Sequence, residues 1–319
     1  MSIEAATNAS RFEEEPRFRI VTGKGGVGKT AIACALALAE AKRGKKVLLA
    51  EANGGDQVAK LLGTSPVGFE MREVLENLHV VDINPSDSIR EYALLLLRFE
   101  SVYKAVFENK FVRHFLRMIP SLGEMVLLGK LWFHEQEIEN GKPRFDVIIL
   151  DAPATGHAIS MVQTPFAVEQ VVPAGAMKEN AQIIRSLLTD QKRTVLELVT
   201  LPEEMPVNEV KKLYHVLSEG LSLKLGHTFV NQCTEEIPQA GIEALQALPS
   251  PLFQHAAETL QEREHRRVAG EQYLNNLPAP LQKSIVRLPR LHLDTRFSIE
   301  HVRALSELIQ GTLERVEDT

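Results

Sequence analysis

The residues with the clearest chemical meaning are Gly23 to Thr30, whose sequence GKGGVGKT ends a glycine-rich loop with a lysine and a hydroxyl residue. Glycines lack the Cβ atoms that would block the loop, so backbone N–H groups can point together at the oxygens of a polyphosphate. An apolar run precedes the loop, and an alanine-rich run follows it. A helix beginning there would add partial positive charge. The pattern therefore predicts a nucleotide-phosphate site between a strand and a helix.

Three side chains near this loop have predicted roles in catalysis or metal binding. Lys29 is expected to reach the β and γ phosphates, and the Thr30 hydroxyl is expected to bind Mg²⁺, which prefers oxygen ligands. Asp151 ends the apolar run Phe145–Asp151 and is placed to orient a water molecule on the same ion; helix capping is the alternative. The residues of the loop predicted to bind nucleotide are Gly23, Lys24, Gly25, Gly26, Val27, Gly28, Lys29, Thr30 and Ala31.

Seven short runs of aliphatic and β-branched residues alternate with longer amphipathic segments, which predicts parallel strands joined by helical crossovers. The run at 147–150 is apolar without alternation, as in strands covered on both faces. We therefore expect an α/β fold with a doubly wound, mainly parallel sheet that binds ligands beyond the carboxyl ends of its strands. The predicted strands are Phe18–Thr22, Lys46–Glu51, His79–Ile83, Phe145–Asp151, Val195–Thr200, His227–Asn231 and Ser284–Leu288.

The length of 319 residues allows either two domains or one sheet with an insertion. The segment at about 84–144 favours an insertion, because it is longer than a single crossover helix requires. Eight aromatic residues fall between positions 92 and 133, so this insertion is predicted to be helical and hydrophobic. We expect a disordered tail at 1–16 and one nucleotide-binding domain at 17–319.

The composition excludes several classes of protein. A net charge of −6 leaves no basic surplus for a nucleic-acid backbone, and no apolar run approaches the roughly 18 to 20 residues that cross a bilayer. The two cysteines, Cys34 and Cys233, lie far apart and form no CxxC pair, which argues against a zinc or iron–sulfur framework within one chain. Free thiols are typical of a reducing compartment, so we predict a cytoplasmic protein.

Two motifs resemble those of known ATPases. The loop KGGVGKT resembles the deviant phosphate loop of the dimeric ATPases related to MinD, ParA and nitrogenase iron protein. The segment Asp151–His157, DAPATGH, resembles the DTAPTGH switch of the arsenite-pump ATPase and of the tail-anchored-protein targeting ATPase, with its middle residues in a different order. This resemblance implies ATP or ADP and magnesium as ligands. It also implies a homodimer in which Lys24 reaches the partner's nucleotide and acts catalytically like an arginine finger; an exposed surface lysine is the alternative.

The resemblance continues to the part of the site that holds the base. Phe229–Gln232 looks like the family's base-recognition strand end, where the amide of Asn231 offers a donor and an acceptor to adenine. A plain role at a strand-to-turn junction is the alternative for Asn231. The loop with Pro289 and Arg290 falls where that family closes over the base, and the resemblance covers nearly all of residues 18–310.

The sequence departs from this family in two places. Where the family's first switch has an aspartate aligned with the attacking water, the spacing places Asn53. An amide orients water but accepts no proton, so we expect slow hydrolysis, with Glu51 or Asp56 as substitutes. The CxxC that binds zinc and the clustered cysteines that bind arsenite are both missing. We therefore expect neither zinc nor an arsenite site.

The hydrophobic insertion has two interpretations. It is either a helical subdomain packed on itself or, as in the targeting ATPase, a nucleotide-controlled groove for an apolar client helix or membrane-protein partner. Two other functions stay open, the energising ATPase of an anion or metalloid exporter and a ParA- or MinD-like positioning ATPase. The latter would need a terminal membrane helix or a basic DNA face, whereas a core helix is predicted from the apolar stripe Ile299, Val302, Leu305 and Leu308.

Overall fold

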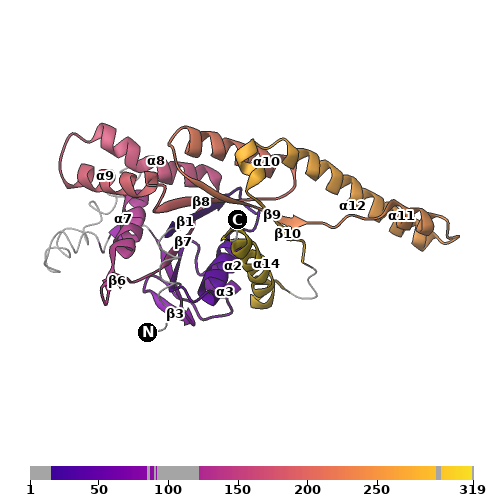
Figure 1. Ribbon diagram of the computed structural model, residues 1–319, viewed down its shortest axis with the longest axis horizontal. Coiled ribbons are helices and arrows are strands. Elements are labelled where there is room, and N and C mark those ends of the chain that lie inside the picture. The colour runs from indigo at the N-terminus through magenta and orange to yellow at the C-terminus, as the bar shows by residue number, and fades with distance from the viewer. Residues whose placement is uncertain (1–15, 85–86, 90, 92–121, 292–295, 318–319) are drawn as a thin grey trace, which may run out of the picture.

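The computed structural model describes residues 16–84, 87–89, 91, 122–291 and 296–317. Its main feature is an eight-stranded sheet in the order β10-β9-β8-β1-β7-β2-β4-β3 (Figure 1). Neighbouring strands pair in parallel except for β3 with β4, which confirms the predicted α/β, mainly parallel fold. The strands are β1 (Phe18–Gly23), β2 (Val47–Ala52), β3 (Arg72–Leu75), β4 (Leu78–Ile83), β7 (Val147–Asp151), β8 (Thr194–Thr200), β9 (Leu225–Cys233) and β10 (Ile285–Pro289).

All seven predicted strands are present, with ends that differ by one or two residues. The sequence pattern missed β3, an antiparallel edge strand of four residues that are exposed or half-buried. It also missed a small hairpin of two-residue strands, β5 (Ile138–Glu139) and β6 (Lys142–Pro143). These elements are too short and too polar to leave an alternating pattern, so only pairing with a neighbour defines them.

Helices cover both faces of the sheet. α2 and α14 form one core with the strands, and α7, α8, α9 and α10 form a second core on the other face. This cover on both sides explains why β1 and β7 are buried along their whole length. The helices are α2 (Lys29–Lys42), α3 (Gln57–Leu61), α7 (Leu122–Gln136), α8 (Thr155–Val171), α9 (Ala176–Thr189), α10 (Glu204–Leu213) with a π-helical turn η1 (Tyr214–Glu219), α11 (Gln239–Gln246), α12 (Pro251–Asn275), α13 (Ala279–Lys283) and α14 (Ile299–Glu317).

α2 lies between the sheet and α14, which explains its alanine- and leucine-rich sequence. Residues 32–41 are all buried, so small and aliphatic side chains let the helix pack on both sides. On α14, Val302 and Leu305 are buried as predicted, but Leu308 is 44% exposed and Ile309 is buried instead. The buried residues Val302, Leu305 and Ile309 are three and then four positions apart, a spacing that keeps them on one face of the helix. The predicted stripe used a constant spacing of three residues and therefore turned away from this face at Leu308.

Buried charges tie β1 to α2 and β8. The Arg19 guanidinium lies 3.2 Å from Glu40 Oε1 and 3.0 Å from Glu197 Oε1. Lys45 Nζ lies 2.9 Å from Glu40 Oε2, and the His227 backbone N–H donates to Glu197 Oε2 at 2.6 Å. We call these five residues the Arg19 cluster. Buried charges are tolerated when they are paired, and both carboxylates here face cationic groups.

The predicted insertion lies only partly within the described residues, because 92–121 fall outside them. Its later part contains α7, in which Met125–Leu128 and Leu131 are buried where the helix packs on α8 and α9. Phe133 is 55% exposed, so not every aromatic side chain of this hydrophobic segment is buried. The helical insertion at 84–144 and the tail at 1–16 stay predictions.

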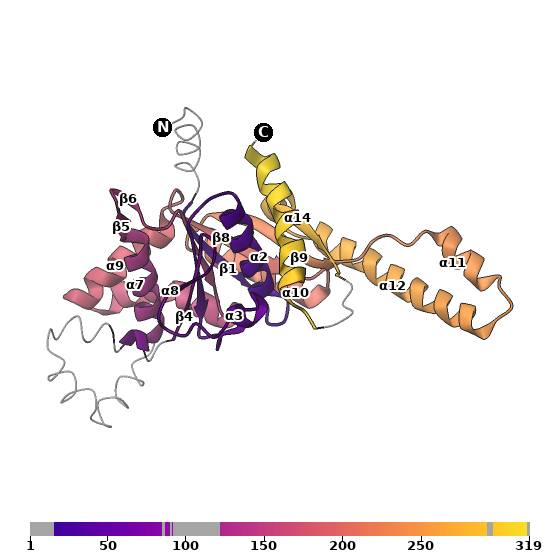
Figure 2. The same ribbon diagram turned by 90° about the horizontal axis from the view of Figure 1, so that it is seen from below.

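α12 forms an arm that projects away from the sheet, and α11 packs against its outer part (Figure 2). The arm leaves the body of the protein near Gly270, where a Cβ atom would lie 2.6 Å from the Pro202 carbonyl oxygen. None of the helices in the described ranges combines the length and the apolar composition that a bilayer-spanning segment requires.

Candidate nucleotide-binding site

The glycine-rich loop joins the carboxyl end of β1 to the N-terminus of α2, as its sequence predicts. A Cβ atom on Gly23 would overlap the Val199 carbonyl oxygen, and one on Gly28 would lie 2.5 Å from Asn231 Nδ2. Gly28 also has a φ of 94°, in the left-handed region that favours glycine. The loop therefore needs glycine at these two positions to fit between β8 and β9.

Lys29 begins α2, and its side chain folds back over the loop. Its Nζ atom donates a hydrogen bond to the Lys24 carbonyl oxygen at 3.1 Å. Burial lowers the pKa of Lys29, and the nearby Asp151 carboxylate partly offsets this effect. The ammonium group thus lies inside the loop, beside the carboxylate predicted to share the site.

Thr30 and Asp151 meet as predicted, at the junction of α2 and β7. The Thr30 hydroxyl donates to Asp151 Oδ2 at 2.7 Å, while Asp151 Oδ1 is buried and has no hydrogen-bond partner among the described residues. Burial raises the pKa of Asp151 to about 6, against the opposing effects of Thr30 and Lys29. A hydroxyl next to a carboxylate with an unsatisfied oxygen fits a small divalent cation that takes oxygen ligands. The residues present therefore fit magnesium.

β2 brings a second buried carboxylate to this edge, just before the loop that leads to α3. Strand register places Glu51 of β2 between Asp151 of β7 and Asp82 of β4. Glu51 is 2% exposed, and burial and the neighbouring Asp82 raise its pKa to about 7. We call the part of the molecule formed by the glycine-rich loop, Asp151 and Glu51 the nucleotide edge.

Asn53 lies in this loop in a left-handed conformation, with a φ of 56°. Its backbone N–H donates to the Ile83 carbonyl oxygen at 2.9 Å. The structure places Asn53 two residues beyond Glu51 but gives no contact between its side chain and Lys29 or Asp151 among the described residues, so its catalytic role stays a prediction. Sequence reasoning named Glu51 and Asp56 only as substitutes for a base, because register between strands is invisible in one sequence.

The residues predicted to bind the base come together around one cavity of about 400 Å³. Asn231 lies at the end of β9, where its Nδ2 donates to the Val27 carbonyl oxygen at 3.0 Å and its Oδ1 accepts from the Gln232 N–H at 2.9 Å. These two hydrogen bonds leave one amide hydrogen and one lone pair of Asn231 unused. The predicted Ala31, Asn231, Pro289 and Arg290 line this cavity together with the unpredicted Gln232, Leu291, Phe297 and Leu305.

The predicted switch segment leads directly from β7 into α8. Thr155 is the first residue of α8 and is buried, and its hydroxyl has no hydrogen-bond partner within the described ranges. Gly156 and His157 are exposed. α8 begins shortly after Asp151 and packs on α7 and α9, so it connects the nucleotide edge with these two helices.

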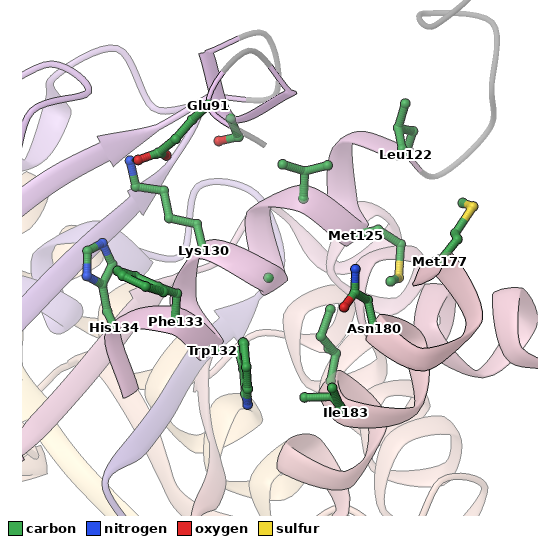
Figure 3. Close-up of a pocket in the computed structure, with 14 residues that line it drawn as sticks. Glu91, Leu122, Met125, Lys130, Trp132, Phe133, His134, Met177, Asn180 and Ile183 are labelled. Carbon is green, nitrogen blue, oxygen red and sulfur yellow. The ribbon is translucent and has the colours of Figure 1, made fainter. Parts of the chain in front are cut away.

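A second cavity of about 280 Å³ lies between α7 and α9, and its lining is mostly apolar (Figure 3). Met125, Trp132, Met177 and Ile183 contribute to its lining. Lys130 lies at its rim, 3.1 Å from Glu91 Oε2 and 3.3 Å from the centre of the Phe69 ring.

The two cysteines do not meet. Cys34 is buried in α2, and Cys233 is half-buried at the end of β9. The described residues also hold no group of three His, Cys, Asp or Glu side chains arranged to bind a metal ion. The absence of zinc and of an arsenite site stays a prediction.

Comparison with known proteins supports the assignment of these motifs. Residues 16–174 match the anion-transporting ATPase (ArsA) family. The chain is 29% identical over 222 residues to ATPase BagA of Mycobacterium tuberculosis. That alignment covers 68% of this chain and 65% of BagA. It is 27% identical over 277 residues to an arsenical pump-driving ATPase of Escherichia coli. That alignment covers 78% of this chain and 44% of the pump-driving ATPase.

The chain is also 22% identical over 268 residues to ATPase GET3 of Kluyveromyces lactis. That alignment covers 73% of this chain and 76% of GET3. The chain spans just under two thirds of the mycobacterial relative and less than half of the pump-driving ATPase. The glycine-rich loop, the parallel sheet around it and the match over residues 16–174 together show that this chain belongs to the ArsA-type, anion-transporting ATPase family.

Proposed function

We propose that this chain binds ATP with magnesium at the nucleotide edge and hydrolyses it to ADP and phosphate. The observation that carries the proposal is the Thr30–Asp151 pair at 2.7 Å, with a buried unsatisfied carboxylate oxygen beside a glycine-rich loop. Bound magnesium would supply positive charge against the phosphate oxygens. Thr30 would hold that ion directly and Asp151 through water, while Lys29 would turn from the Lys24 carbonyl towards the phosphates.

The remaining predicted residues have distinct roles in this proposal. The backbone of Gly23 to Ala31 holds the phosphates, and the amide of Asn231 and the Pro289–Arg290 loop hold the adenine. Asn53 orients the attacking water without accepting its proton, which makes hydrolysis slow. Lys24 completes the site of a second copy in a homodimer.

We further propose that the cavity between α7 and α9 is part of a surface for an apolar client helix or a membrane-protein partner. Its apolar lining and its position beside α8 support this proposal, because α8 begins at the switch segment. A change at Thr155–His157 on loss of the γ-phosphate would move α8 and alter the cavity. We place the protein in the cytoplasm.

ATP binding and phosphate release test the enzymatic part. Wild type should bind a fluorescent ATP analogue and release phosphate slowly in magnesium, and Lys29→Ala should lose both activities. Tight binding without phosphate release would reduce the proposal to a nucleotide-binding switch. Failure to bind ATP would overturn it.

Peptide binding tests the client. An apolar helical peptide should bind ATP-loaded and nucleotide-free protein with different affinities, and Ile183→Lys should weaken it. Equal affinity in both states would overturn the coupling. Stimulation of phosphate release by arsenite or another oxyanion would instead favour the energising ATPase of an exporter, the function named for the pump-driving relative.

A further inference from the structure

Glu51 is an unusual residue at the nucleotide edge. It is 2% exposed, it lies in register with Asp151 and Asp82, and no cationic side chain pairs with it among the described residues. A buried carboxylate without a cation destabilises a fold unless other groups satisfy it. The hydrogen-bond partners of Glu51 therefore indicate the role of its carboxylate.

Those partners are backbone groups of the next helix. Glu51 Oε1 accepts hydrogen bonds from the Gln57 N–H at 2.9 Å and from the Val58 N–H at 3.4 Å. These amides form the first turn of α3, where helix N–H groups have no partner within the helix. Glu51 thus ties the end of β2 to the start of α3, and the Asn53–Asp56 loop lies between these two fixed points.

Gly54 shows that this loop rests directly on the carboxyl group. A Cβ atom on Gly54 would overlap Oε1 and Cδ of Glu51. The backbone of Gly54 is not in the left-handed region, unlike that of Gly55 with its φ of 66°. Glycine is therefore required at position 54 for space against Glu51 and not for its φ angle.

The loop is also fixed at its two ends. The Asn53 N–H donates to the Ile83 carbonyl oxygen at 2.9 Å. At the other end, Asp56 Oδ1 accepts from the Val67 and Gly68 N–H groups at 2.8 Å and 3.0 Å. Hydrogen bonds thus hold both ends of the loop, and Gly54 between them packs directly against the Glu51 carboxyl.

We propose that Glu51 is a positioning residue for ATP hydrolysis, which sets the place of Asn53 by supporting Gly54 and capping α3. The inference rests on the proposed ATPase function. Glu51 acts through its acceptor oxygen and its shape and touches no reacting atom. The attacking water therefore depends on a residue that lies beneath the loop and outside the nucleotide contacts.

Steady-state kinetics separates positioning from binding. Glu51→Ala should lower kcat by about tenfold or more, because small displacements of a water-orienting group have large effects on rate. The Kd for ATP should stay within about threefold, since the glycine-rich loop is untouched. Glu51→Gln keeps an acceptor oxygen and should recover most of the lost kcat. Unchanged kcat in Glu51→Ala, or an equal loss in Glu51→Gln, would overturn the proposal.

A double-mutant cycle tests the contact with Gly54. Gly54→Ala should lower kcat because its methyl group displaces the loop from Glu51. In the Gly54→Ala, Glu51→Ala double variant the methyl group has room, so the two losses should not add. Fully additive losses would overturn the role of this contact. Thermal unfolding of each variant confirms that the fold is retained, with Glu51→Met as the replacement if Glu51→Ala does not fold.

Hydrogen exchange tests the same geometry without hydrolysis. In Glu51→Ala the amides of Gln57 and Val58 should exchange about tenfold faster or more than in wild type, and Glu51→Gln should protect them. Unchanged exchange would overturn the proposal. Wild type that protects these amides but releases no phosphate would refute the proposed hydrolysis, and wild type that hydrolyses ATP with a fully active Glu51→Ala would refute only the inference.

Discussion

Two regions with buried charged residues adjoin β1 and α2 and have opposite properties. In the Arg19 cluster, Glu40 and Glu197 are buried beside Arg19, Lys45 and His227. At the nucleotide edge, Asp151 and Glu51 are buried too, but among the described residues neither makes an ion pair. Matched charges thus lie on β1 and α2, whereas the unmatched carboxylates lie at the carboxyl ends of the neighbouring strands β7 and β2.

The pKa values of the two regions differ in the same way. Burial raises the pKa of Glu197, but His227 and Arg19 outweigh this effect and the pKa is lowered overall. Burial raises the pKa of Asp151 to about 6 and that of Glu51 to about 7. The Arg19 cluster is therefore paired within the fold, whereas Asp151 has no ion-pair partner among the described residues, a place that the magnesium ion of the proposed function would take.

Breaking the Arg19 cluster should have the largest effect on stability. Arg19→Met leaves Glu40 and Glu197 without their shared partner and should lower the free energy of unfolding by about 3–5 kcal/mol. Urea unfolding measures this change. A loss below about 1 kcal/mol would show that these charges are not held by mutual pairing.

At the nucleotide edge, Asp151→Asn should lower kcat about a hundredfold, because the charge that orients the metal-bound water is lost. Phosphate release measures the effect. His227→Gln, a change in the Arg19 cluster, is the matched control and should leave kcat unaltered. Similar losses in both variants would erase the functional distinction between the regions.

The pH dependence of stability should have opposite signs for the carboxylates of the nucleotide edge and for Glu197 of the Arg19 cluster. Raised pKa values mean that Asp151 and Glu51 favour the folded state at low pH, and this contribution is lost as pH rises through about 6 and 7. The Tm of nucleotide-free protein should therefore rise between pH 8 and pH 6, and less so in an Asp151→Asn, Glu51→Gln double variant. The lowered pKa of Glu197 has the opposite effect, a loss of stability only as pH falls below about 4.5. A wild-type Tm that is flat above pH 6 would contradict this account.

Asn231→Ala should have the smallest effect. It removes the hydrogen bond to the Val27 carbonyl and one contact to the base, so the Kd for ATP should increase about tenfold. Fluorescence titration measures this change. An unchanged Kd would limit Asn231 to a structural role between β9 and the glycine-rich loop.

The sequence predicted much of the nucleotide edge because local patterns encode it. The loop Gly23–Thr30 and Asp151 at a strand end are recognisable from their immediate neighbours, whereas Asn231, Pro289 and Arg290 were predicted from the family resemblance. The Arg19 cluster left no such signal, since Arg19 and Glu197 are 178 positions apart. The row of Asp151, Glu51 and Asp82 likewise depends on strand order and register, which follow from packing of the whole sheet.

The most direct test of the central claim compares the stability of wild type and Asp151→Asn at pH 8, without nucleotide and with magnesium and ATP. If the carboxylate is held unmatched for a ligand, Asp151→Asn should have the higher Tm without nucleotide, and wild type should have the higher Tm with magnesium and ATP. A variant that is less stable in both conditions, or a nucleotide-induced shift equal in both proteins, would contradict the account.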